Sequence, residues 1–326
     1  MNFVQRPVKS WTVAADQAGI RLDAFLRHCL PHLSLGEARR AIDEKAFWVN
    51  ERPGKKGNRL FAGALISLRG PAGWLAGNPV AASDLEVSIL YEDRFILALD
   101  KPAGMPTHGR SGGARNSLAN FLAAARPSLR GIGASPWELG LVHRLDRETS
   151  GVVLAAKDQP SFENLRSQFR QRAVKKRYWA LVRGIPKGDG VIDYPLIHDP
   201  AERKKMKALR EKGRRRNRRR AWKALTRFRA LSRSGQFSLL EVSMETGVTH
   251  QIRAHLEAIG HPLAGDRLYG DPLYARSRAD PVGLGRHFLH AFYIGFLHPS
   301  TGQEMAIESP LPGELKKVLD RLNIGF

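Results

Sequence analysis

The chain has 326 residues, 42% of them hydrophobic, which is enough for two domains and a sizeable core. Its 53 Lys and Arg residues outnumber its 31 Asp and Glu residues, and the formal net charge of +22 predicts a polyanionic partner, with nucleic acid first. We find no apolar run long enough to span a bilayer and no secretory leader, so we expect no membrane association and a cytoplasmic location. The single cysteine, Cys29, leaves no internal disulfide and fits a reducing compartment.

The N-terminal part of the chain predicts a small helical module. Residues 1–16 show no strong periodicity and are expected to be a tail, in which a short strand is the alternative. Apolar side chains then recur at helical spacing from Leu22 to Cys29, which predicts a first helix. Ser34, followed three residues later by Glu37, predicts a capping box at the start of a second helix.

Residues 17–69 as a whole are predicted to be two short helices followed by small strands. Their cations lie on the second helix and on the turns after it: Arg39, Arg40, Lys45, Lys55 and Lys56. Such cations usually form a solvated face, but in so basic a chain they favour phosphate contact. The pattern resembles the compact RNA-binding domain named after the fourth small-subunit ribosomal protein. Asp23 opens the first helix, where the helix dipole explains a carboxylate.

Residues 70–84 are rich in Gly, Pro and Ala and are predicted to be a linker to a larger domain, residues 85–326. Alternating apolar positions on either side of a charged turn at residues 92–94 predict a hairpin at its start. Ser117 and Ser161 are each expected to begin a helix.

A polar turn follows between two apolar segments. Five titratable side chains occupy the six positions from His143 to Glu148, directly before the apolar run 152–156. Buried charge of this kind costs several kcal/mol unless it is paired or used in chemistry, so the turn is either a solvated ion-pair turn or a reactive one. The string His143-Arg144-Leu145-Asp146, with Thr149-Ser150-Gly151 after it, resembles the signature of the RluA family of RNA pseudouridine synthases.

This resemblance implies roles for four residues. Asp146 corresponds to the catalytic aspartate, and Arg144 beside it to an arginine that fills the space left by the target base. The pattern Lys-x-Tyr-x-Ala-x-Val-x-Gly begins at Lys176 and places Tyr178 on one face of a strand, where it is either an ordinary strand aromatic or, as the resemblance implies, the ring that stacks on the target base.

A third matching string runs from Thr246 to Leu256. Its apolar residues recur at helical spacing, and Thr249 is expected to cap this helix. The resemblance implies that Arg253 pairs with the catalytic aspartate. Val248 stands where the family usually has an arginine, so a phosphate contact at that position is not expected here.

Between Arg203 and Arg220, twelve of eighteen positions are Lys or Arg, and Glu211 is the single acidic residue. No core can be built from this segment, so it is predicted to be a basic loop that becomes ordered on RNA phosphate. It should raise affinity and salt sensitivity without adding sequence specificity. The expected RNA contacts are Arg214, Arg215, Arg216, Arg218, Arg219 and Arg220.

Together these patterns predict an α+β protein: a small α/β RNA-binding module followed by a mixed, mainly antiparallel sheet domain flanked by helices. The resemblance implies isomerisation of uridine to pseudouridine in structured RNA, with large-subunit ribosomal RNA as the expected substrate. The sequence has no dinucleotide fingerprint, phosphate-binding loop, metal-spaced Cys/His set or glycosidase-type carboxylate pair, so we expect no cofactor and no metal. We also expect a monomer.

Two alternatives come from other classes. A non-catalytic RNA-binding or ribosome-assembly factor would use only the small module and the basic segment. A metal-dependent nuclease would need an acidic cluster that this sequence lacks.

Overall fold

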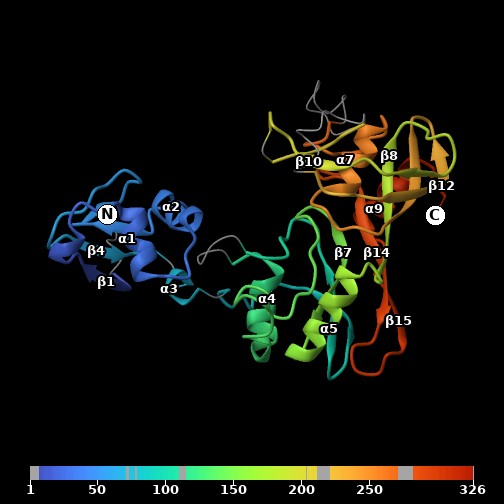
Figure 1. Ribbon diagram of the computed structural model, residues 1–326. Helices are drawn as coiled ribbons and strands as arrows, with labels where there is room; N and C mark the ends of the chain where they lie inside the picture. The colour runs from blue at the N-terminus through green and yellow to red at the C-terminus, as the bar shows by residue number, and fades with distance from the viewer. Residues whose placement is uncertain are drawn as a thin grey trace. The chain divides into compact units, whose positions relative to one another are not determined.

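The computed structural model describes residues 7–70, 73–77, 79–109, 115–202, 204–210, 221–270 and 282–325. Contacts divide the chain into two compact units (Figure 1). We call Met1–Glu86 with His108–Leu139 the N-terminal unit, and Val87–Thr107 with Gly140–Phe326 the sheet unit. No helix among the described residues is long and apolar enough to cross a membrane.

The N-terminal unit contains a four-stranded antiparallel sheet in the order β1-β4-β2-β3. Its strands are β1 (Lys9–Thr12), β2 (Phe47–Val49), β3 (Arg52–Pro53) and β4 (Leu65–Leu68). Two helices, α1 (Leu22–Cys29) and α2 (Leu35–Asp43), pack against each other. The predicted capping box of α2 is confirmed, because the Ser34 hydroxyl accepts from the Glu37 N–H and the Glu37 carboxylate accepts from the Ser34 N–H.

Two segments without a sequence signal for regular structure contribute to this unit. The expected tail contains β1, and Trp11 of that strand packs against Phe47 with ring centroids 6.2 Å apart. The expected linker contains the short helix α3 (Gly73–Ala76), whose Trp74 is fully buried in the core of the module. The strand β1 agrees with the short strand that the tail could contain. The helix α3 departs from the linker expectation because burying the large indole of Trp74 stabilises local structure that Gly- and Pro-rich composition disfavours.

The same unit includes α4 (Leu118–Ala125) and the 3₁₀ turn η2 (Pro127–Leu129). The Ser117 hydroxyl accepts from the Asn120 N–H, so this predicted cap is confirmed. The Asn120 side chain donates to the Val80 carbonyl, and the Asn120 carbonyl accepts from the Ala82 N–H. Part of the expected linker is therefore hydrogen-bonded to α4.

The sheet unit is built on nine described strands. They are β5 (Ser88–Glu92), β6 (Ile96–Lys101), β7 (Ser150–Ala156), β8 (Lys175–Arg183), β9 (Gly190–Ile192), β12 (Thr226–Ser234), β13 (Phe237–Met244), β14 (Leu289–Leu297) and β15 (Glu304–Glu308). The order is β5-β6-β7-β14-β8-β13-β12-β9, with β15 paired to β14. The pair β7 and β14 is parallel and the other pairs are antiparallel, which confirms the predicted mixed, mainly antiparallel sheet and its opening hairpin. The strands β10 (Leu196–His198) and β11 (Met206–Ala208) form a separate pair. The prediction that residues 203–220 are a loop without a core is therefore wrong for residues 206–208, because strand pairing and the burial of Met206 against Leu196 and Tyr269 order them.

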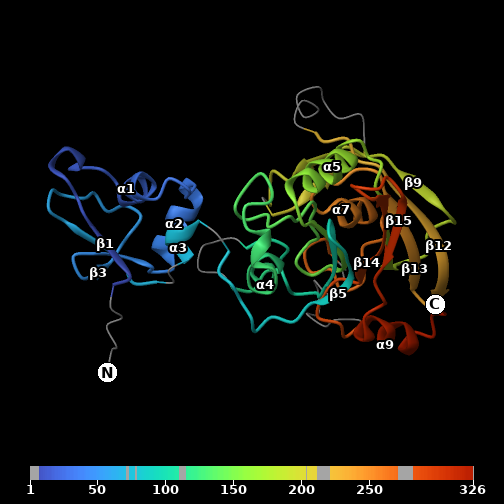
Figure 2. The same cartoon turned by 90° about the horizontal axis from the view of Figure 1, so that it is seen from below.

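Helices cover both faces of this sheet: α5 (Gln159–Arg170), α7 (Gln251–Ala258) and α9 (Gly313–Arg321). The core under α9 contains Leu181, Phe237, Leu239, Leu315, Val318 and Leu319. Because side chains alternate along a strand, Tyr178 of β8 points to the opposite face from Leu181. Figure 2 shows α7 and α9 on opposite sides of the strands.

Two predicted helix caps are wrong. The cap of α5 is Asp158, whose carboxylate accepts from the Ser161 N–H at 2.7 Å, and not Ser161 itself. The helix α7 begins at Gln251 after His250, which has a left-handed φ of 54°, and Thr249 does not cap it. The Gln251 side-chain oxygen accepts from the Val248 N–H at 3.2 Å, which fixes the backbone just before the helix, and no side chain that the structure describes caps the first turn.

Candidate active site

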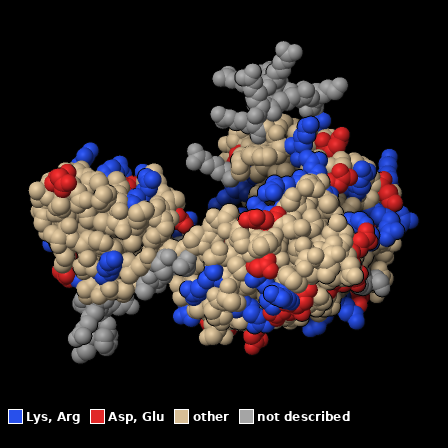
Figure 3. All heavy atoms as spheres, turned by 60° about the horizontal axis from the view of Figure 1, so that its bottom comes forward, with Lys and Arg blue, Asp and Glu red and all other residues tan. Residues whose placement is uncertain are grey.

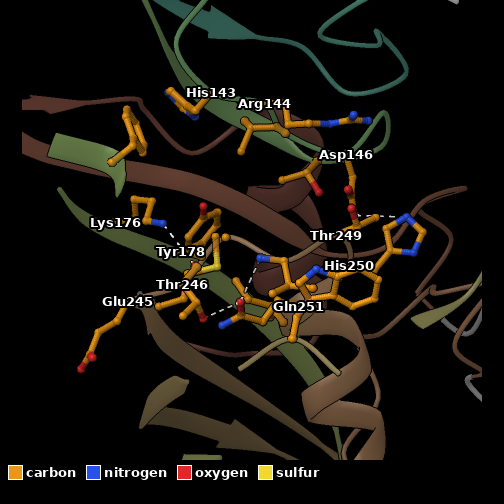
Figure 4. A pocket seen from close by; sticks show the side chains of 18 of the residues that line it. His143, Arg144, Asp146, Lys176, Tyr178, Glu245, Thr246, Thr249, His250 and Gln251 are labelled. Atoms are coloured by element: carbon orange, nitrogen blue, oxygen red, sulfur yellow. Dashed lines mark hydrogen bonds and ion pairs between the residues drawn. The ribbon is translucent and has the colours of Figure 1, made fainter. Parts of the chain in front are cut away.

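A pocket of about 640 Å³ lies in the sheet unit, and Asp146, Tyr178 and Arg253 all line it. Arg144, the fourth residue that the motifs predict for this site, lines it as well. Figure 4 shows Asp146 and Tyr178 on opposite sides of the opening, with His250 beside Asp146. The structure therefore brings together residues from three strings that lie far apart in the sequence.

The loop that carries Asp146 is held from the segment after β6. The Thr107 hydroxyl donates to the Leu145 carbonyl at 3.0 Å and accepts from the Leu145 N–H at 3.1 Å. The fully buried Lys101 ammonium donates to the carbonyls of Pro102, Met105 and Arg147 at 2.8, 2.7 and 3.2 Å. These contacts fix the backbone on both sides of Asp146. Because the Lys101 side chain is buried, its pKa is lowered to about 7.

The far end of the loop is held by a second buried cation. Arg286 donates to the Glu148 carbonyl at 3.1 Å and to the Ser150 hydroxyl at 3.2 Å, and it forms an ion pair with Glu314 at 2.9 Å. Thr149 contacts the His287 ring nitrogen at 2.9 Å. Burial lowers the pKa of His287 to about 3, with the charge of Arg253 acting in the same direction, so this imidazole is neutral at pH 7.

Arg253 bridges two carboxylates. Its Nε and Nη2 donate to Asp266 at 2.8 and 2.9 Å, in the bidentate geometry that a guanidinium favours, and its Nη1 donates to Asp146 at 3.2 Å. The Asp266 side chain is fully buried, whereas that of Asp146 is 21% exposed and open to the pocket. Asp266 therefore fixes one edge of the guanidinium so that the other edge is directed at Asp146. The alternative of a self-contained ion-pair turn is not what the structure shows.

The charges in this cluster stabilise one another. Burial alone would raise the pKa of Asp266, but the hydrogen bonds and charge of Arg253 more than offset it and lower the pKa to about 2. Burial would lower the pKa of Arg253, but the two carboxylates raise it above its ordinary value. Arg253 is thus a permanent cation beside Asp146.

A tyrosine connects Arg253 to a further pocket residue. The Tyr269 ring lies 4.9 Å from the Arg253 guanidinium carbon, and its hydroxyl accepts from the Met206 N–H at 2.7 Å. The same hydroxyl lies 3.0 Å from His250 Nδ1. A hydroxyl that accepts from Met206 still has its own proton to donate. When it donates this proton to Nδ1, the proton of a neutral His250 is on Nε2, 3.8 Å from Asp146. Burial lowers the pKa of His250 although Asp146 opposes the shift.

Tyr178 forms part of the pocket wall as a neutral phenol. The residue is 4% exposed, and burial together with the charge of Asp146 raises its pKa. Its neighbours on the same face of β8, Ala180 and Val182, are fully buried, as the predicted alternation requires. An aromatic ring held in this way can offer a face to a planar ligand.

Cations dominate the rest of the pocket lining. They are Arg144, Arg166, Arg170, Arg172, Lys176 and Lys223, against the single additional acid Glu245. Burial lowers the pKa of Lys176 to about 8. Lys and Arg side chains also gather in several groups on the visible face of the sheet unit (Figure 3). This lining suits a polyanionic ligand. Among the residues that the structure describes, no group of three or more His, Cys, Asp and Glu could hold a metal ion.

The other residues predicted to bind RNA lie elsewhere in the chain. In the N-terminal unit, Arg39 forms an ion pair with Asp23 at 2.8 Å and Lys56 forms one with Asp43 at 2.6 Å. The remaining cations predicted there are Arg40, which is partly buried, and Lys45 and Lys55, which are exposed. The predicted contacts from Arg214 to Arg220 lie outside the described residues.

Sequence reasoning assigned no role to His250, Asp266 or Tyr269. His250 lies inside the string that predicted Arg253, and Asp266 ends an apolar segment from Leu263. An acidic residue in an apolar segment indicates a buried partner, and this signal was present. This signal does not identify the cation, because the pairing depends on how the segment after α7 returns to that helix.

Comparison with known proteins agrees with these features. The sequence pattern of the RNA pseudouridylate synthase family matches residues 95–258. The chain is 35% identical over 320 residues to a protein of Neisseria meningitidis named ribosomal large subunit pseudouridine synthase D, covering 96% of this chain and 81% of that one. It is 34% identical over 331 residues to ribosomal large subunit pseudouridine synthase C of Vibrio vulnificus, covering 99% of both.

A solved structure shares the fold. Human RNA pseudouridylate synthase domain containing 4 superposes with a TM-score of 0.57 at 27% identity, covering 73% of this chain and 94% of that one. The resemblance predicted from the three strings is thus confirmed at the level of the family. The chain belongs to the RNA pseudouridylate synthase family, whose enzymes isomerise uridine to pseudouridine in RNA.

Proposed function

We propose that this enzyme acts on uridines of large-subunit ribosomal RNA and that Asp146 is its catalytic residue. The names of its relatives support the substrate. The observation that carries the catalytic assignment is the Asp146–Arg253 ion pair, in a pocket that also contains Tyr178. A rival function, RNA binding without catalysis, gives no reason for a buried arginine to be directed at a pocket carboxylate.

The reaction breaks the bond between ribose and uracil nitrogen, turns the base, and joins a ring carbon to the same ribose. No outside atom or electron enters, so the proposal needs no cofactor and no metal. Asp146 acts as nucleophile or base in its ionised form. Taking an anion out of water is unfavourable, and the fixed charge of Arg253 at 3.2 Å offsets that cost.

The target uridine must leave its stack to reach Asp146, which costs a few kcal/mol. Stacking on Tyr178 returns about 1 to 3 kcal/mol of this cost. Arg144 then occupies the space that the base has left. Tyr178 contributes its ring and not its acidity, because burial raises its pKa above the ordinary value.

The remaining cations hold the RNA backbone in this proposal. Residues 17–69 act as the RNA-binding module that their pattern resembles, with Arg39, Arg40, Lys45, Lys55 and Lys56 toward phosphate. Arg39 and Lys56 exchange their present carboxylate partners for phosphate at little cost, since about half of each side chain is exposed. The segment 203–220, apart from the strand β11 within it, adds affinity without sequence specificity. We place the enzyme in the cytoplasm as a monomer.

The test is the substitution Asp146→Asn, with Glu148→Gln as the matched control. Glu148 lies in the same loop, but its side chain is 44% exposed and does not line the pocket. We expect D146N to bind a large-subunit ribosomal RNA transcript nearly as tightly as the parent and to form no pseudouridine, while E148Q retains both properties. Nucleoside chromatography after digestion measures the product. Pseudouridine formation by D146N at the parental rate would overturn the catalytic assignment.

A further inference from the structure

The pocket contains an aromatic residue that the proposed mechanism does not use. Trp222 lines it and is 46% exposed, whereas Tyr178 in the same pocket is 4% exposed. With a volume of about 640 Å³, the pocket is much larger than one uracil ring. An indole left half in water at the edge of such a pocket offers a large apolar surface to a ligand.

The backbone holds this indole in place. The backbone N–H of Trp222 donates to the Leu196 carbonyl at 2.8 Å, and the backbone carbonyl of Trp222 accepts from the Leu196 N–H at 2.9 Å. The ring of His198 lies perpendicular to the indole at 5.2 Å. Leu196 and His198 belong to β10, which is itself paired with β11. Little conformational freedom would therefore be lost when a ligand stacks on Trp222.

The surroundings of Trp222 carry positive charge. Lys223 follows it directly, and Arg170 and Arg172 line the same pocket. All three side chains are exposed, and within the described ranges none of them forms an ion pair with a carboxylate. An exposed aromatic ring among such cations is the combination that binds single-stranded nucleic acid, where bases stack and phosphates are neutralised.

We propose that Trp222 is a second base-stacking site, which holds a nucleotide adjoining the target uridine in the same RNA strand. This inference rests on the proposed function, since it takes the uridine on Tyr178 as its neighbour. When the target base leaves the stack, the adjoining base loses a stacking partner, and the indole replaces that partner. The site accepts any base, because every base has a π face.

The test compares two probes, uridine 5′-monophosphate and a five-nucleotide oligouridylate, by calorimetry on the full chain. We expect Trp222→Ala to weaken oligouridylate binding about tenfold and the mononucleotide by less than about twofold. Trp222→Phe, which keeps a ring, should retain most of the oligouridylate affinity. Leu231→Ala is the matched control, since Leu231 is 39% exposed but lies outside the pocket lining.

Fluorescence gives a second readout that does not depend on affinity. Stacking on the indole should quench tryptophan emission when oligouridylate is added to the parent, and W222F should lose that component. Equal oligouridylate affinity for the parent and W222A, or unchanged quenching in W222F, would overturn the inference. Failure of the proposed function looks different: Tyr178→Ala would then leave mononucleotide binding unchanged, whatever Trp222 does.

Discussion

Replacing Asp266 with Asn should destabilise the protein by an amount that depends on pH. The pKa of Asp266 is about 2 in the folded chain against an ordinary value of 3.8, and each pKa unit corresponds to about 1.4 kcal/mol. Because the folded pKa is depressed, this stability is present above the ordinary value and is lost as the pH falls toward 2. The parent should therefore exceed D266N by about 2 kcal/mol at pH 6, and the gap should shrink by about 1 kcal/mol at pH 3.

Urea unfolding followed by circular dichroism at both pH values measures this gap. The matched control is Asp43→Asn, because Asp43 also pairs with a cation, Lys56 at 2.6 Å, but its side chain is 56% exposed. An exposed pair contributes less than about 1 kcal/mol. D266N should also slow pseudouridine formation, because an amide can accept from only one of the two Arg253 nitrogens that the carboxylate binds, so Nη1 is held less firmly toward Asp146. Parental stability of D266N at pH 6, or an equal gap at both pH values, would refute this reasoning.

Four further outcomes are expected. Thr107→Val removes both hydrogen bonds to Leu145, which should cost about 1 to 3 kcal/mol and lower kcat while the Kd for RNA is kept; an unchanged kcat would contradict the bracing role. His250→Gln should slow turnover without changing its pH profile above about pH 7, since burial lowers the pKa of His250 below its ordinary value of 6.5; loss of a pH step in that range in the variant would show that His250 titrates there. Tyr178→Phe should keep most activity and Tyr178→Leu should lose most of it, as measured by nucleoside chromatography, and equal losses would show that the hydroxyl matters. Deleting residues 211–220, which leaves β11 and its contact with Tyr269 in place, should flatten the salt dependence of the RNA Kd by about 0.7 to 0.9 per lost phosphate contact while the reaction at saturating RNA survives, and an unchanged slope would show that this segment does not contact phosphate.

The pocket residues were predictable because each stands in a string of its own. Asp146, Tyr178 and Arg253 were identified separately, and the fold only had to bring them together. The bidentate contact between Arg253 and Asp266 was not predictable in the same way. It requires the loop after α7 to return to that helix, and no local pattern records which buried cation an isolated carboxylate meets.

The failed predictions come from judging segments by local composition. Trp74 lies among Gly and Ala residues, yet it is fully buried because the core formed by α1, α2 and β4 accommodates it. Thr249 has the side chain of a good cap, but Gln251 donates to the Leu225 carbonyl and the Thr226 hydroxyl and so fixes where α7 begins. In both places a contact distant in sequence outweighs a local preference.

The position of β14 in the sheet has a consequence for when the enzyme becomes active. β14 lies between β7 and β8, although it follows both of them by more than a hundred residues, so it joins two groups of strands that are made earlier. Until it inserts, the strand that follows Asp146 and the strand that carries Tyr178 have no common neighbour. A nascent chain that does not yet include β14 has the parts of the site but not the assembled site, so modification of RNA can begin only after β14 has been made.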